Sequence, residues 1–368
     1  MKKRSTTPSI LVGDIGGTRT RLSLYDGRGK TLLLEAVLPS REHATFDEIA
    51  LRFLSSASHP HPTVAVLGVA GPIRDRVATV TNLPWKLDER QLARKLSIPE
   101  VVLANDLAVA AAGCLHLPPE VALTLDDRKP TPKGNHMAVI AAGTGLGEAR
   151  LVWDGSKHLV LPTEGGHTDF APRTPLEIEL WHYLSNRFPD HVSYERVLSG
   201  DGLGALYDFF ASRSGREPRA IARKLEQGDR NAAIAELGLA RAYRPATRAV
   251  DLFASIYGAE AGNLALKELA LGGVFVAGNI ARHIVPARRE LFLEGFRKKG
   301  RFSALMSTIP VVVVTDPLVG VRGALAMARD LIAAREGAPP KSQRAPQKAV
   351  KKAAKKTVKK AGRKKRSG

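Results

Sequence analysis

Two apolar segments that each end in a glycine-rich turn constrain this chain more than any other feature. The first runs Ile10-Leu11-Val12 and ends in Gly13-Asp-Ile-Gly-Gly-Thr18. The second, 137–142, ends in Gly143-Thr-Gly-Leu-Gly147. Glycine lets backbone N–H groups turn toward a phosphate with no Cβ in the way. One such turn alone is more often a plain tight turn, but the repeat indicates that the chain begins a second, similar unit near residue 137.

The remaining apolar pattern predicts a mixed α/β fold, because strands first follow one another and then alternate with helices. A chain of 368 residues is also long for one core, which favours two domains or two lobes around a cleft. The expected strands are 10–12, 21–25, 32–37, 64–69, 77–80, 101–103, 137–142, 149–153, 272–278 with its glycines, and 311–314; the expected helices are 46–56, 107–115, a mostly helical region 176–271, and 320–335.

The net charge of +20 is distributed unevenly. Residues 341–368 carry 13 Lys and Arg and no acid, so the rest of the chain has a net charge of +7. Like charges four residues apart oppose a helix, and the tail has too little apolar surface to offset its ordering entropy, so we expect disorder. Two interpretations stay open: a solvated tail without a partner, or non-specific binding of nucleic acid or another polyanion.

The apolar runs indicate a cytoplasmic protein. None approaches the roughly 18 to 20 residues that cross a bilayer, and the basic start, 1–9, is followed by no long apolar segment typical of secretion. The only cysteine, Cys114, lies in an Ala-rich stretch, where we expect a buried and unreactive thiol.

The first glycine turn suits a magnesium nucleotide. It is not a Walker loop, since no Gly-Lys-Ser/Thr follows, and it does not open a helix with the dinucleotide-binding pattern. Asp14 can hold Mg²⁺ directly or through water, while Thr18 donates its hydroxyl.

Polar residues in three places are candidates for a polyol site. Asp106 follows the strand 101–103, where a carboxylate can act as a base, although Asn105-Asp106 can equally cap the helix after it. Glu164 and His167 flank a Gly-Gly turn, and Glu195 follows later. A zinc site formed by His and Glu is disfavoured, because the chain lacks the usual spacings of zinc ligands.

Six segments, taken in order, resemble the bacterial glucokinase family over residues 9–335. They are Gly13-Asp-Ile-Gly-Gly-Thr18, Leu103-Ala-Asn-Asp106, Ala142-Gly-Thr-Gly-Leu-Gly147, Glu164-Gly-Gly-His-Thr-Asp-Phe170, Glu195-Arg-Val-Leu-Ser-Gly200 and Gly272-Gly-Val-Phe-Val-Ala-Gly278. The resemblance implies the fold of the hexokinase, actin and heat-shock chaperone ATPase superfamily: two ribonuclease-H-like lobes around a central cleft. The implied parts are a small α/β lobe of 9–116 with 318–335, a large α/β lobe of 117–317, and a disordered Lys-rich tail, 336–368.

The resemblance also implies a reaction: ATP-dependent phosphorylation of the 6-hydroxyl of glucose to glucose 6-phosphate, with Mg²⁺ and a homodimer as expected companions. By resemblance, glucose is bound by Asn105, Asp106, Glu164, His167 and Glu195, and Asp106 is the catalytic base. The implied ATP-binding residues are Gly13, Asp14, Ile15, Gly16, Gly17, Thr18, Gly143, Thr144, Gly145, Gly273 and Gly278, with Asp14 holding Mg²⁺ directly or through water.

The chain departs from the family pattern at two positions. Arg19 stands where Asn is usual, and its side chain can contact a phosphate or point to solvent. Asn279 stands where a second glycine is usual, but Asn tolerates a left-handed backbone well. Trp85, in a segment similar to the family's substrate-side loop, can equally be a packing residue.

Two alternative functions remain. One is a kinase for another hexose, such as mannose, fructose or an amino sugar. The other is a sugar-sensing regulator that binds DNA through the basic tail, although only about nine residues precede the first strand, too few for a helix-turn-helix.

Overall fold

The first glycine turn follows the central strand of a five-stranded sheet. The computed structural model describes residues 9–56 and 59–336, so most of the expected tail, 337–368, lies outside the described residues. The sheet has the order β3-β2-β1-β4-β8, with β1 (Ser9–Ile15), β2 (Arg19–Tyr25), β3 (Leu32–Pro39), β4 (Pro62–Val69) and β8 (Glu100–Asn105). Strands β1 to β3 are antiparallel neighbours, whereas β4 lies parallel to both β1 and β8.

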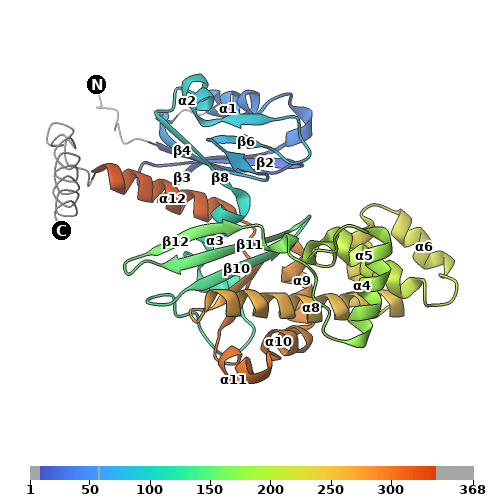
Figure 1. The fold of residues 1–368 in the computed structure, drawn as a ribbon. Helices are drawn as coiled ribbons and strands as arrows, with labels where there is room; N and C mark the ends of the chain where they lie inside the picture. Colours follow the sequence, from blue (N-terminus) through green and yellow to red (C-terminus); the bar gives the residue numbers. More distant parts are fainter. Residues whose placement is uncertain (1–8, 57–58, 337–368) are drawn as a thin grey trace, which may run out of the picture. The chain divides into compact units, whose positions relative to one another are not determined.

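A second sheet of six strands repeats this order around the second glycine turn. Its order is β12-β11-β10-β13-β14-β9, with β9 (Ala122–Thr124), β10 (Met137–Ala142), β11 (Leu146–Trp153), β12 (His158–Thr163), β13 (Val274–Ala277) and β14 (Val311–Val314). Again three antiparallel strands lead to two parallel ones. The repeat predicted from the two glycine turns is therefore present in the strand pairing (Figure 1).

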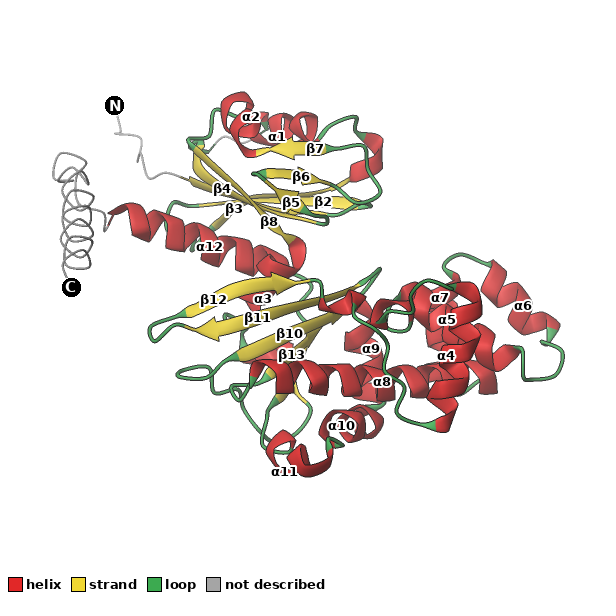
Figure 2. Ribbon diagram, in the orientation of Figure 1, coloured by secondary structure: helices red, strands yellow, loops and turns green. Residues whose placement is uncertain are grey.

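Helices cover the first sheet because its central strands are apolar on both faces. Helix α1 (Phe46–Ser55) begins at Thr45, whose side chain accepts a hydrogen bond from the Glu48 N–H, and α2 (Glu89–Lys95) begins at Asp88 in the same way. Their apolar faces share one core with β1, β4 and a small antiparallel sheet, β5 (Ile73–Arg74), β6 (Val77–Thr79) and β7 (Lys86–Asp88) (Figure 2).

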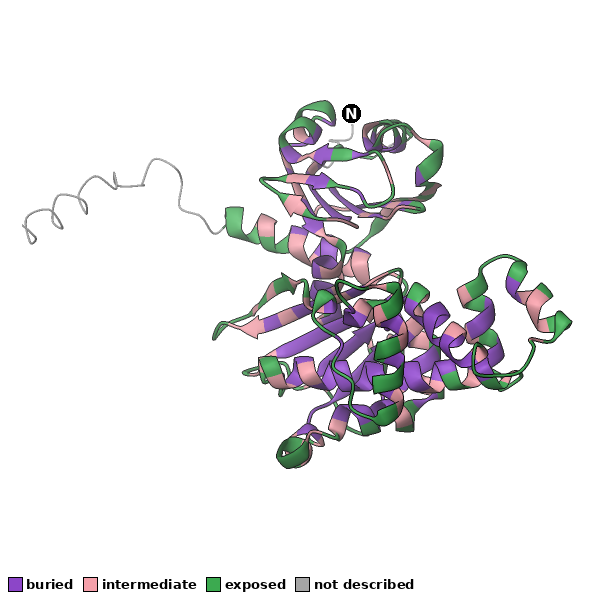
Figure 3. Ribbon diagram, turned by 45° about the vertical axis from the view of Figure 1, so that its right-hand side comes forward, coloured by how far each residue is buried: buried purple, intermediate pink, exposed green. Residues whose placement is uncertain are grey.

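The region 176–271, expected to be mostly helical, forms a helical bundle next to the second sheet. It contains α4 (Pro175–Arg187), α5 (Gly200–Ala211), α6 (Arg219–Glu226), α7 (Arg230–Leu239) and α8 (Arg244–Glu268). Helix α8 is buried along most of its length, which agrees with its apolar residues on several faces (Figure 3). The hydroxyl of Tyr257 on α8 accepts a hydrogen bond of 3.0 Å from the Ala142 N–H, which fixes the strand end just before Gly143.

Three further helices, α9 (Asn279–Ala287), α10 (Arg289–Arg297) and α11 (Ser303–Met306), follow β13. The last, α12 (Val319–Glu336), crosses from one structural unit, which ends at Ala328, into a second that begins at Arg329.

Helix α3 (Asp106–Cys114) contacts strands of both large sheets. It is short and rich in Ala and Gly, so neighbouring backbone can approach closely: a Cβ built on Gly113 would overlap the carbonyl oxygen of Val319. Cys114 is buried, as predicted, and burial raises the pKa of its thiol. Within the described ranges, no helix has the length and apolar content to cross a membrane.

Candidate active site

The candidate base lies where β8 passes into α3. The Asn105 side-chain oxygen accepts hydrogen bonds from the backbone N–H groups of Leu107 at 3.0 Å and Ala108 at 3.2 Å, so Asn105 caps the helix. Asp106 also accepts from the Leu107 N–H, at 2.8 Å. The structure thus confirms that Asn105 caps α3. Because the cap fixes the backbone at the start of this helix, it also fixes the direction in which the neighbouring Asp106 side chain leaves the first turn.

Asp106 is close to a second carboxylate, Asp14, which belongs to β1. The side chain of Asp106 is exposed to a cavity but has enough protein around it that desolvation raises its pKa, and the negative charge of Asp14 adds to the increase. Burial also raises the pKa of Asp14, while the positive charge of Arg21 opposes that increase. Two carboxyl groups held together in this way attract a cation.

A cavity of about 630 Å³ is lined by Asp106 together with two of the other sugar candidates, Asn105 and Glu164. Glu164 lines it at the end of β12, and Gly147 of the second glycine turn lines it from another side. The remaining lining residues are Pro72, Ile73, Arg74, Leu103, Ala104, Asn105, Asp106, Leu107, Ala108, Pro162 and Thr163. The structure therefore brings Asn105, Asp106 and Glu164 together.

Glu195 and His167 line a neighbouring cavity of about 290 Å³. Glu195 lies in a 3-10 turn, Tyr194–Arg196, and its Oε2 accepts a hydrogen bond of 3.0 Å from the Leu146 N–H. A Cβ built on Gly145 would lie 2.5 Å from the same oxygen. The carboxylate of Glu195 therefore contacts the second glycine turn directly.

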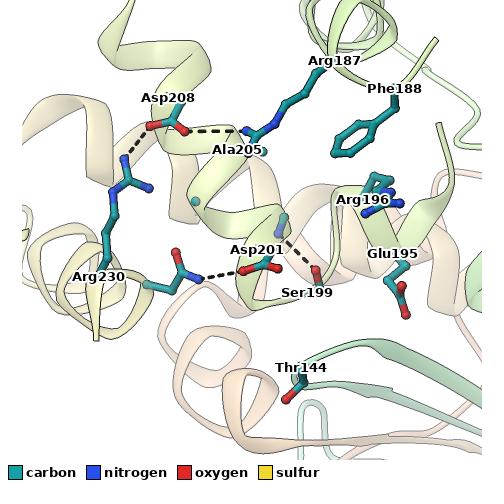
Figure 4. A pocket seen from close by; sticks show the side chains of 13 residues that line it. Thr144, Arg187, Phe188, Glu195, Arg196, Ser199, Asp201, Ala205, Asp208 and Arg230 are labelled. Atoms are coloured by element: carbon teal, nitrogen blue, oxygen red, sulfur yellow. Dashed lines mark hydrogen bonds and ion pairs between the residues drawn. The ribbon is translucent and has the colours of Figure 1, made fainter. Parts of the chain in front are cut away.

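Glu195 also borders a third cavity, of about 440 Å³, together with Thr144 (Figure 4). Figure 4 shows Thr144 and Glu195 at the lower edge of this cavity and Asp208 with Arg187 at the upper edge. Arg187 and Arg230 both pair with Asp208, at 3.8 Å and 2.5 Å. Glu195 thus lines one cavity together with the sugar candidate His167 and another together with Thr144 of the predicted phosphate turn.

Beyond the second glycine turn lies a cavity of about 590 Å³ with a largely apolar wall. Gly143 and Thr144 line one part of it, three carboxylates, Asp201, Asp229 and Glu236, also border it, and its apolar wall comes from α5, α7 and α9, namely Leu203, Ala232, Ala235, Leu239, Ile280 and Ile284. The backbone of the turn is held by the N–H of Gly200, which donates to the Gly143 carbonyl at 2.9 Å. Planar apolar ligands suit such a wall, with Asn231, Asn279 and His283 as polar partners.

The first glycine turn is held by residues that the sequence did not single out. The Ser40 hydroxyl donates to the Gly16 carbonyl at 2.8 Å, and a Cβ built on Gly17 would lie 2.9 Å from the Thr81 carbonyl. Arg19 is exposed at the start of β2. Trp85 is buried, and its indole N–H donates to the His43 carbonyl at 3.2 Å, so it is a packing residue.

Two of the predicted ATP-binding glycines, Gly273 and Gly278, lie at opposite ends of β13. Gly278 precedes α9 with φ of 96°, and a Cβ there would overlap the Ala142 carbonyl. Gly278 thus allows β10 and the start of α9 to approach closely, next to Asn279 in the wall of the largely apolar cavity. Gly273, with φ of 131°, lies before β13, beside Pro310.

Sequence reasoning missed most of this apolar wall. Asn279 and Ile280 directly follow the Gly272–Gly278 segment. This adjacency is the one sequence feature that could have predicted that they line the cavity. The α7 residues carried none, because their helical apolar pattern looks like any buried helix. In the part of the chain that the structure describes, no group of three or more His, Cys, Asp or Glu could hold a metal ion.

Comparison with known proteins assigns the chain to a family. A glucokinase family model matches residues 11–331. A glucokinase of Nostoc sp. is 39% identical over 86% of this chain and 97% of its own length. Among solved structures, a glucokinase from an Antarctic psychrotroph is 30% identical, with a TM-score of 0.76 over 88% of this chain and 99% of that one. A Balamuthia mandrillaris glucokinase, solved with glucose, is 24% identical with a TM-score of 0.74 over 88% and 94% of the two chains, and so supports the fold alone.

Proposed function

This chain belongs to the glucokinase family of sugar kinases, and from that premise we propose that it transfers the γ-phosphate of ATP to the 6-hydroxyl of glucose. One observation carries the proposal furthest. Asp106 faces a cavity that Asn105 and Glu164 also line, and it lies near the carboxylate of Asp14 on β1 of the same five-stranded sheet.

In the proposed reaction Asp106 is the general base. Phosphoryl transfer needs chiefly positioning and charge neutralisation, plus a group that accepts the hydroxyl proton late in the step. The helix cap made by Asn105 fixes the backbone from which Asp106 projects. Glu164, His167 and Glu195 are the proposed partners of the other glucose hydroxyls, since carboxylates accept hydrogen bonds from them well.

The phosphates of ATP are proposed to lie against Gly13–Thr18 and Gly143–Gly145. Gly143 supports this, because a Cβ built there would meet nothing within 4 Å and the backbone is open to a ligand. The apolar wall formed by α7 and α9 suits the adenine ring, at the far side of Thr144 from Glu195.

Asp14 fits the proposed role toward Mg²⁺. Its carboxyl is largely desolvated beside a second carboxyl, an arrangement that a cation would relieve. When bound with the nucleotide, Mg²⁺ supplies neutralisation of phosphate charge. Since the described residues offer no larger ligand cluster, the nucleotide phosphates and water would provide the other ligands.

We further propose that the two large sheets belong to two ribonuclease-H-like lobes around a cleft, 9–116 with 318–335 and 117–317. The repeated strand order supports this. The start of α12 packs closely against α3, which belongs to the first lobe, and this supports the return of the chain to that lobe. A Cβ on Gly113 of α3 would overlap Val319, and a Cβ on Gly323 of α12 would overlap Val109.

A coupled assay over a small sugar panel, with ATP and Mg²⁺, tests the reaction. We expect kcat/KM for glucose to exceed that for mannose, fructose and glucosamine by about tenfold or more, because unpaired buried groups penalise the wrong sugar. The control is 6-deoxyglucose, which lacks the acceptor hydroxyl and should inhibit without being phosphorylated. Preference for another hexose would replace glucose as the substrate, and no turnover with any sugar would refute the kinase.

A further inference from the structure

A buried carboxyl lies beneath the turn that carries Glu164 and His167. Glu148 follows the second glycine turn on β11 and is 2% exposed. A Cβ built on Gly165 would overlap Glu148 Oε2, so only glycine lets the turn lie against this carboxyl. The Thr163 hydroxyl donates to the Glu148 carbonyl and accepts from the Gly165 N–H, both at 3.2 Å. Glu148 therefore contacts the backbone between the two proposed glucose ligands.

A second buried carboxyl, Glu260, faces Glu148 from α8 and is 0% exposed. The Asn263 amide donates to Glu260 Oε2 at 2.7 Å and to the Tyr194 hydroxyl at 3.1 Å. Tyr194 is buried and directly precedes Glu195 in the same turn. Glu260 is thus connected to the segment that carries the third proposed ligand.

Each of the two carboxyls has an oxygen that no donor in the described ranges satisfies: Oε1 of Glu148 and Oε1 of Glu260. Lys267 Nζ lies 3.6 Å from the latter, too far for a hydrogen bond. A buried polar oxygen without a donor is costly. A proton held between the carboxyls supplies the missing donor, so the pair is satisfied only when it carries one.

The charges around the pair favour that proton on Glu148. Burial, followed by the negative charge of Glu260, raises the pKa of Glu148 to about 8; Lys267 opposes the increase, and Glu268 adds to it. Lys299, which donates to Asn263 Oδ1 at 2.5 Å, has a pKa lowered to about 8 by its own burial. Glu148 is therefore the carboxyl of the pair that holds the proton at pH 7.

We propose that the buried Glu148–Glu260 pair positions both segments that carry glucose ligands, the Glu164–His167 turn and the Tyr194–Glu195 turn. Both are positioning residues, since the structure places neither in the cavities that contain Asp106 or His167. The glucose part of this inference rests on the proposed function.

Three variants test the pair. Glu148→Gln keeps the shape and supplies an amide donor toward Glu260, so the KM for glucose at pH 7 should stay close to wild type. Glu148→Ala leaves a void under Gly165 and removes the shared proton from Glu260 Oε1, and should raise the KM for glucose about tenfold with a smaller change in kcat. Glu177→Gln is the matched control: its carboxyl is equally buried but pairs with Arg173, so it should leave the KM unchanged.

The pH dependence separates positioning from mere packing. Because the pKa of Glu148 is raised from 4.5 to about 8, its contribution to stability is fully present below about pH 4.5, falls as pH rises from there, and is gone above about pH 8. Between pH 5 and 8.5 the wild type should lose thermal stability more steeply than Glu148→Gln, and between pH 7 and 9.5 it should lose glucose affinity more steeply. Lys299 is present in both proteins, so the difference between the two curves reports Glu148.

Amide hydrogen exchange gives a readout without catalysis. Exchange in 163–168 and 193–197 should accelerate in Glu148→Ala and not in Glu177→Gln. Equal alkaline losses in wild type and Glu148→Gln, or no difference in exchange between the Ala variant and the control, would overturn the proposal. Absence of kinase activity in the wild type would instead refute the proposed function. The Glu148–Glu260 pair would still be tested by thermal melting and hydrogen exchange, which need no catalysis.

Discussion

In the proposed reaction Asp106 would serve both a helix and the chemistry. At the first position of α3 it accepts a backbone hydrogen bond, and its side chain also lines a cavity. Asparagine retains the first property, because it is also a good acceptor at a helix start, but it cannot accept a proton.

We therefore predict that Asp106→Asn folds and binds glucose but loses about 10² to 10⁴ in kcat, the usual contribution of a general base. Steady-state kinetics and glucose titration measure the two effects separately. The control is Asp88→Asn, since Asp88 caps α2 through the Gln91 N–H and lines none of the cavities described above. Near-normal turnover in Asp106→Asn would exclude Asp106 as the base.

If Asp106 is the base, we predict that it sets the acidic limb of the pH profile. Desolvation, followed by the negative charge of Asp14, raises the pKa of Asp106. A general base must be ionised to accept a proton, so kcat/KM should fall as the pH decreases. This fall should begin at a higher pH than for a carboxyl group with an ordinary pKa. The residual activity of Asp106→Asn should lack this limb.

At the scale of elements, one glycine controls how close a strand and a helix can lie. Gly278 combines a positive φ with a position at which a Cβ would overlap the Ala142 carbonyl on β10. Gly155, in the hairpin between β11 and β12, has a similar φ of 103° but nothing within 4 Å of a built Cβ. The two glycines thus differ mainly in the neighbouring backbone.

We predict that Gly155→Ala costs about 1 kcal/mol of unfolding free energy, from the left-handed backbone alone. Gly278→Ala should cost about 1 to 3 kcal/mol more, because α9 must move away from β10. Urea denaturation measures both. Since α9 carries Ile280 and Ile284, the KM for ATP should rise more than the KM for glucose; equal stability losses would show that the backbone relaxes at no cost.

At the scale of the whole molecule, most of the positive charge lies outside the described fold. The segment 341–368 carries 13 of the +20 charges and contains no aromatic residue to stack on bases. Binding to a polyanion through such a tail would release counterions and weaken steeply with salt.

Deletion of everything after Arg335 should leave glucose phosphorylation intact and abolish retention on duplex DNA at low salt. A full-length control with Gln at the six paired lysines 351, 352, 355, 356, 359 and 360 should also lose most retention, which separates charge from length. Equal retention by truncated and full-length protein would refute a DNA-binding tail, and loss of kinase activity would make the tail part of the enzyme.

The homodimer stays a prediction.

The sequence by itself determined the local elements that depend on short-range chemistry. The glycine turns, the strands before them and the Asn105 cap are each fixed by neighbouring residues, and every predicted strand is present, six of the ten longer by two to four residues. It missed the short strands β5, β7 and β9, and also β12, an edge strand whose side chains are half exposed and which ends near Pro162, because these carry no clear apolar signal.

Only the tertiary structure decided which distant residues meet. The resemblance to a family predicted that Asn105, Asp106 and Glu164 belong to one site. The cavity that they share, however, depends on the pairing of strands far apart in the chain. The apolar wall of α7 and α9 and the Glu148–Glu260 pair have no sequence signature. A buried Glu and an exposed Glu are the same letter, and burial, which sets their protonation, arises only when helices and sheets pack.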